Sequence, residues 1–120
     1  MVQLRLILVT LVAVEALGIM LFEMFGSQTK AAQRAFGLSA DFLAQPEARV
    51  AFANQGLYNG FLGVGLLVAE FALVGAASLL MQRVFLIFII VAAVFGMITV
   101  SRQIIWTQGL PAILALLALL

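Results

Sequence analysis

The sequence predicts an all-α protein, a polytopic membrane four-helix bundle with an interfacial segment between its first and second helices. Two observations lead to this prediction. Hydrophobic residues make up 66% of the 120 residues and charged residues only 9%, whereas soluble domains hold about half and about a quarter. The apolar residues are also grouped into stretches long enough to cross a hydrocarbon layer as helices. We therefore expect a single transmembrane domain over residues 1–120.

The first expected span covers residues 4–25. This stretch is apolar apart from four side chains, and as a helix it would be about 30 Å long. A cleaved signal peptide is the alternative, because Arg5 precedes an apolar run. The run is too long for one, contains Glu15 near its centre and is not followed by a small-residue cleavage site. We therefore expect a retained membrane-spanning helix.

The loop expected at residues 26–45 is the only polar region of any length. Its apolar residues predict a short, weakly amphipathic segment at the membrane interface; they are Ala35, Phe36, Leu38, Phe42 and Leu43. Pro46 followed by Glu47 is typical of a helix start. The helical pattern then continues to about Leu80, which is too long for one crossing, so the second span is expected at residues 57–80.

Two further spans are expected at residues 84–100 and 104–120, with Met81-Gln82-Arg83 as a tight connection before the first of them. Pro111 should kink the last helix or leave a carbonyl unpaired. Four spans place both termini on one face. A slight excess of Lys and Arg on the face of the long loop favours a multi-pass protein of the cell membrane with this loop in the cytoplasm.

Polar side chains from all four spans are expected at one level, close to the long loop. Lipid cannot solvate such groups, so they must find partners inside the protein. This level predicts a ligand-binding pocket, formed by Glu15, Glu23, Asn54, Gln55, Tyr58, Asn59 and Gln108. Secondary candidates are Glu70, Thr99 and Arg102.

Each of these candidates also has a structural interpretation. Glu15 and Glu70 are expected near mid-membrane, where acids are functional candidates by default, although a protonated carboxyl bonded to a neighbouring helix is the alternative. The amides of the second span could serve only to hold helices together. Gly56 and Gly60 form a small-xxx-small pair, which is typical of close helix packing.

Several classes of chemistry are disfavoured by composition. The chain has no cysteine and no histidine, which excludes thiol chemistry and His-ligated haem or zinc. The net charge is +1 and no basic stripe is present, so nucleic acid is not an expected partner. No nucleophile–base pair, phosphate loop or metal cluster is recognisable, so we expect no catalytic residues, no metal and no cofactor.

Several short motifs occur in order along the chain: Glu23-Met24-Phe25, Phe36-Gly37-Leu38 and Gln108-Gly109-Leu110-Pro111-Ala112. The most specific is the block Asn54-Gln55-Gly56-Leu57-Tyr58-Asn59-Gly60. Over nearly its whole length the chain thereby resembles a family of small bacterial integral membrane proteins known as a domain of unknown function, number thirteen-oh-four. The resemblance implies four spans and brings no assigned activity.

We expect the chain to bind a small or amphipathic molecule in the polar pocket on the loop side. A proton-coupled exporter using Glu15 is the first alternative, because the length of this chain and its four expected spans are similar to those of small multidrug resistance transporters. The second is a non-catalytic assembly subunit, or a homo-oligomer, joined through Gly56 and Gly60. A membrane enzyme is less favoured, because no cluster of arginines is present to hold an anionic cofactor.

Overall fold

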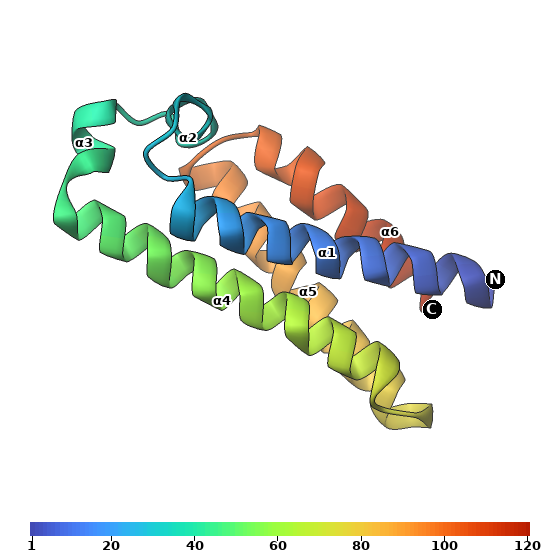
Figure 1. The fold of residues 1–120 in the computed structure, drawn as a ribbon. Coiled ribbons are helices and arrows are strands. Elements are labelled where there is room, and N and C mark those ends of the chain that lie inside the picture. Colours follow the sequence, from blue (N-terminus) through green and yellow to red (C-terminus); the bar gives the residue numbers. More distant parts are fainter.

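The computed structural model describes residues 1–120 and consists of helices joined by short turns, which confirms the all-α class. Figure 1 shows the order of the elements. They are α1 (Val2–Phe25), α2 (Lys30–Phe36), α3 (Ala40–Ala44), α4 (Pro46–Phe71), α5 (Gly75–Thr99), the π-helical turn η1 (Ile105–Gly109) and α6 (Leu110–Ala118).

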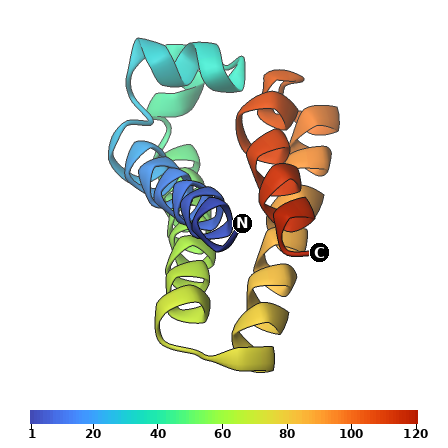
Figure 2. The ribbon, with the colours of Figure 1, turned by 90° about the vertical axis from the view of Figure 1, so that its right-hand side faces the viewer.

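The long helices form two pairs that pack against each other. Helix α1 lies against α4 and α6, while α5 lies against α4, η1 and α6. Figure 2 shows α1 and α4 on one side and α5 and α6 on the other. The short helices α2 and α3 lie beyond the end of α1, and the two termini lie together at the opposite end (Figure 1). Both termini thus lie at one end, as the alternation of the four expected helices predicts.

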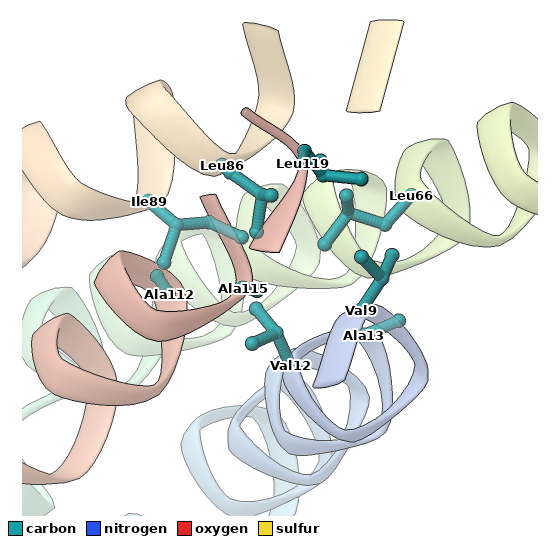
Figure 3. Close-up of a cluster of buried hydrophobic side chains, with 9 residues drawn as sticks. All are labelled: Val9, Val12, Ala13, Leu66, Leu86, Ile89, Ala112, Ala115 and Leu119. Atoms are coloured by element: carbon teal, nitrogen blue, oxygen red, sulfur yellow. The ribbon is translucent and has the colours of Figure 1, made fainter. Parts of the chain in front are cut away.

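The core is built mainly from small and branched side chains of the four long elements (Figure 3). Alanines on α1 and α6 allow these two helices to approach closely. Leucines of α4 and α5 belong to the same buried cluster. The buried cluster consists of Val9, Val12, Ala13, Leu66, Leu86, Ile89, Ala112, Ala115 and Leu119.

The turn between α4 and α5 lies at residues 72–74, so the connection expected at Met81-Gln82-Arg83 is wrong. Gly75 follows the turn with φ of +62°, a backbone conformation that glycine adopts without the steric cost of a side chain. The polar residues after the turn bond within the helical hairpin instead of forming a loop. The Ser78 hydroxyl donates to the Ala69 carbonyl at 2.6 Å, and Gln82 donates to Ser78 Oγ at 2.9 Å.

The segment between α1 and α4 contains two short helices with side-chain caps. Thr29 Oγ1 accepts a hydrogen bond from the Ala32 amide, and Ser39 Oγ accepts one from the Phe42 amide. Pro46 occupies the first turn of α4, as the sequence predicts. The structured segment therefore corresponds to the loop expected at residues 26–45, with helical content in both of its halves.

The last helix begins with a π-helical turn immediately before Pro111. Proline has no amide hydrogen, so the usual bond from residue 111 to the carbonyl four positions earlier is missing. The chain instead closes a wider turn, in which the Leu110 amide donates to the Ile105 carbonyl. The irregularity expected at Pro111 therefore takes the form of a π turn.

Two helices, α1 and α5, are long and apolar enough to cross a membrane. Helix α4 has a comparable length but falls below that level of apolarity, because its first half contains charged and amide side chains. The apolar segment Ile105–Ala118 is shorter. Of the four long elements, α1 and α5 are therefore both long and apolar, α4 is long but less apolar, and Ile105–Ala118 is apolar but short.

Candidate functional site

The buried carboxylate of Glu23 is the centre of a polar cluster between α1 and α4. Only 2% of this residue is exposed. Its Oε2 accepts a hydrogen bond from Gln55 Nε2 at 2.6 Å, and its Oε1 accepts one from Asn59 Nδ2. Gln55 and Asn59 are four residues apart, so they lie on the same side of α4, one turn from each other. Two neutral amides thus hold one buried acid.

Glycines of α4 allow the two helices to approach closely enough for these bonds. A Cβ added at Gly56 would lie 2.9 Å from the Met20 carbonyl oxygen, and one at Gly63 would lie 2.8 Å from the Ala13 carbonyl oxygen. Gly60 is buried against the Met20 side chain. The small-residue face of α4 is therefore covered by α1 of the same chain, and a homo-oligomer would have to use another surface.

A small cavity lies next to this cluster, where α1, α4, α5 and η1 meet. Its volume is about 10 Å³, which is the space occupied by one water-sized group. Three polar residues contribute to its lining, one each from α1, α4 and η1; they are Glu15, Asn59 and Gln108. Its apolar lining consists of Val12, Ala16, Ile19, Leu62 and Ile89.

Asn59 belongs both to the Glu23 cluster and to the cavity. Its amide nitrogen donates to Glu23, which leaves its carbonyl oxygen as an acceptor. The Glu15 carboxyl and the Gln108 amide lie around the same cavity. The lining therefore combines one acid with two amides, which can accept and donate hydrogen bonds, and it suits a small polar group.

Gln108 reaches this cavity from the π-helical turn. Gly109, which follows it, is buried close to Ala93 of α5, so the wide turn packs tightly against that helix. π turns are frequent at functional positions because they displace side chains from the regular helical register. Sequence analysis identified Gln108 as a candidate and Pro111 as an irregularity, but did not connect the two.

Five expected site residues do not contribute to the cluster or the cavity, and four of them are exposed. Asn54 is exposed, and Tyr58 is 68% exposed with its ring edge-on to Phe61. Thr99 is exposed and donates to the Phe95 carbonyl of its own helix. Arg102 is likewise exposed, in the turn before η1.

Glu70 lies in the last turn of α4, near the opposite end from the loop-side cluster. Thr10 Oγ1 of α1 donates to Glu70 Oε2 at 2.8 Å. Glu70 was expected near the middle of the second span, but α4 ends at Phe71, so Glu70 lies at the end of its helix and bonds to α1 there. Together with Ser78 and Gln82 it shows that hydrogen-bonded polar side chains also occur far from the long loop, outside the one level at which they were expected.

Arg83 is a further polar residue far from the long loop, and its contact was not predicted from the sequence. Arg83 Nη2 donates to the Leu119 carbonyl at 2.7 Å, which ties α5 to the end of α6. The polar triplet that contains Arg83 resembled a turn, and this concealed its role within a helix.

No group of three or more His, Cys, Asp or Glu side chains is placed to hold a metal ion.

Comparison with known proteins identifies the family of the chain. The family model described as "Protein of unknown function (DUF1304)" matches residues 10–120. A protein of Lactococcus lactis subsp. lactis (strain IL1403), named "Uncharacterized protein YpaA", is 41% identical over 118 residues, which cover 98% of each chain. No solved structure matches the chain. The matches over nearly the full length show that this chain belongs to the DUF1304 family.

Proposed function

We propose that the chain crosses the membrane four times as a helical bundle and binds a small polar group in the pocket on the side of the long loop. The spans are α1, α4, α5 and the η1–α6 segment. The exposed faces of these helices support the topology. In the apolar windows of α1 and α5 only 22% of the residues are buried within the chain, so most residues there are at least partly exposed.

Exposed leucine, valine and phenylalanine side chains occur on every long helix, including α4. Examples are Leu11, Val14, Phe61, Val64, Phe88, Val91, Leu114 and Leu117. Exposed apolar surface costs about 25 cal/mol per Å² in water, and its occurrence on every long helix favours a membrane or protein contact. A hydrocarbon environment on all sides accounts for it without a separate partner for each helix.

The observation that carries the binding proposal is the double role of Asn59. The residue is fixed by its hydrogen bond to Glu23 and also lines the cavity beside Glu15 and Gln108. A polar side chain held in place by a neighbour is pre-organised for a ligand, because little conformational freedom is lost on binding. The pocket thus consists of a fixed amide flanked by one acid and a second amide.

The volume of the cavity limits the group that it accepts. A space of about 10 Å³ admits a water, a hydroxyl or an ammonium group, but no ring system. An amphipathic ligand would place this polar terminus in the cavity and its hydrocarbon part against the apolar side chains. Glu15, the one acid of the lining, favours a cationic terminus over an anionic one.

Binding is tested with three detergent-solubilised ligands of equal chain length: octylammonium, octanol and octyl sulfate. Trp106 is the only tryptophan and lies two residues before Gln108, so its fluorescence reports on this region. We expect octylammonium to bind most tightly and octyl sulfate least. Glu15→Gln and Asn59→Leu should abolish the difference while circular dichroism still shows a folded protein. Equal responses to the three ligands in the wild type would refute the site.

The topology is tested separately by cysteine labelling. The natural chain has no cysteine, so each introduced thiol gives an unambiguous signal. We expect Ser39→Cys in the long loop to react with a membrane-impermeant maleimide from one side only. Gln3→Cys should react only from the other side. Labelling of both from the same side would exclude four crossings.

A proton-coupled exporter is the second candidate, and one contrast favours it. Glu23 and Glu70 are each hydrogen-bonded to a side chain of another helix, whereas Glu15 lines the cavity. An acid next to a cavity at this depth can exchange a proton for a cation. The proposal predicts uptake of methylammonium into proteoliposomes under an imposed pH gradient above the passive level of protein-free vesicles, and uptake at that passive level by Glu15→Gln. Equal uptake by the wild type and by protein-free vesicles would rule it out.

A further inference from the structure

A basic groove lies on α2, away from the cluster and the cavity between the long helices. It is lined by Lys30, Gln33, Arg34 and Leu38. Lys30 and Arg34 are four residues apart, so they are neighbours on one side of the helix. Both side chains are exposed, and no acidic residue lines the groove.

The helix that carries this groove is firmly anchored to the rest of the chain. Phe36 lies between Phe22 of α1 and Phe52 of α4, with ring centroids 5.9 and 4.6 Å away. Ala32 is fully buried, and the Thr29 hydroxyl caps the start of the helix. The two cationic side chains therefore project from a fixed platform.

The chemistry of the lining suits a phosphate group. Arginine presents a planar fork of N–H donors to phosphate oxygens, and lysine supplies a compact second charge. The Gln33 amide adds a neutral donor, while Leu38 provides an apolar border. A phosphate ester of a hydrocarbon-bearing alcohol would place its phosphate against the polar residues and its hydrocarbon against Leu38.

The position of α2 decides which phosphate is expected. The helix lies beyond the end of α1, whose last residue, Phe25, is an apolar side chain 77% exposed. In the proposed topology, on which this inference rests, that level corresponds to the lipid headgroups. We infer that the groove binds the phosphate of an anionic phospholipid and fixes the long loop to the membrane surface.

The inference is tested by lipid titration of the purified full chain in a neutral detergent. Phosphatidylglycerol and phosphatidylcholine with identical acyl chains are added in separate series, and bound lipid is measured by native mass spectrometry. We expect a clear preference for phosphatidylglycerol. A basic residue near a lipid surface contributes about fivefold to affinity, so the double variant Lys30→Gln/Arg34→Gln should weaken phosphatidylglycerol binding about 25-fold.

Arg49→Gln is the matched control, because Arg49 is an exposed basic residue of α4 that does not line the groove. It should retain the preference. Equal binding of both lipids by the wild type, or an unchanged preference in the double variant, would overturn the inference. Displacement of the lipid by an equal concentration of inorganic phosphate would also overturn it, because the groove would then be a site for free phosphate.

This outcome is independent of the cavity experiment. Loss of octylammonium binding in Glu15→Gln concerns α1, α4 and η1, whereas the lipid titration concerns only exposed side chains of α2. The cysteine labelling shows whether the loop lies at a membrane surface at all. Failure of the topology and failure of the lipid site are thus separately visible.

Discussion

Glu23 of α1 and Asn59 of α4 are hydrogen-bonded to each other although 36 residues separate them in the chain. This bond lies at the interface where the glycines of α4 meet the backbone of α1. Asn59 also lines the cavity, together with Glu15 and Gln108. The packing of two helices therefore determines the position of the residue on which the proposed site depends.

Loss of the Glu23 carboxylate should destabilise the fold because it leaves two amides without their acceptor. We expect Glu23→Leu to lower the free energy of unfolding by about 1–3 kcal/mol. Unfolding by SDS in mixed micelles measures this change. In a double-mutant cycle with Asn59→Leu, the coupling energy should be about 0.6–1.7 kcal/mol, as for other hydrogen bonds between membrane helices. Strict additivity of the two substitutions would show that the bond does not stabilise the protein.

Alanine should have opposite effects at two glycines of the first and second long helices. The added Cβ at Gly63 would lie 2.8 Å from the Ala13 carbonyl oxygen, so α1 and α4 must move apart. We expect Gly63→Ala to destabilise the protein by about 1–3 kcal/mol.

Gly18→Ala is the matched control, because a Cβ added at Gly18 would meet no atom of a neighbouring element within 4 Å. It should stabilise helix α1 by up to about 1 kcal/mol. The melting temperatures of the two variants in the same detergent measure both effects. Equal shifts would mean that α1 and α4 are not in close contact at Gly63.

The hydrogen bond from Thr10 to Glu70 should contribute to the packing of α1 against the last turn of α4. Thr10→Val keeps the shape of the side chain and removes the hydroxyl donor. We expect a loss of about 1 kcal/mol in unfolding free energy. Thr99→Val is the control, because the Thr99 hydroxyl bonds only to the Phe95 carbonyl within its own helix. A loss as large in the control would contradict a contribution from the contact between the helices.

The position of the turn between α4 and α5 can be tested by chemical labelling. Val74 lies in the turn and is 85% exposed, whereas Gln82 is buried within α5 and donates to Ser78. In the proposed topology the turn lies on the side of the termini, so in intact vesicles Val74→Cys should react rapidly with an impermeant maleimide added on that side. Gln82→Cys should react slowly or not at all. The reverse order would move the turn back to residues 81–83.

The α4–α5 turn shows how far sequence patterns reach in this chain. Met81-Gln82-Arg83 is the most polar triplet between two apolar runs, and such a triplet ordinarily marks a turn. In the structure these residues lie within α5, where Gln82 bonds to Ser78 and Arg83 to the Leu119 carbonyl. A polar residue in an apolar segment needs a partner, and sequence alone does not show whether that partner is water or another helix.

The loop-side cluster shows both success and failure at one site. The prediction that Glu23, Gln55 and Asn59 lie at one level is confirmed by their hydrogen bonds. Asn54 and Tyr58 belong to the same block of sequence but are exposed. The helical period sets the angles of Asn54 and Tyr58 around α4 relative to Asn59. It does not set which side of α4 faces α1.

The sequence by itself determined the helical class, the start of α4 at Pro46 and the common level of the loop-side acid and amides, because apolar length and the helical repeat are local properties. Only the tertiary structure decided where α4 ends, which polar residues became partners and which faced outward. These outcomes depend on how each helix is rotated against its neighbours. That rotation is set by close contacts such as Gly63 against Ala13, which join residues far apart in the chain.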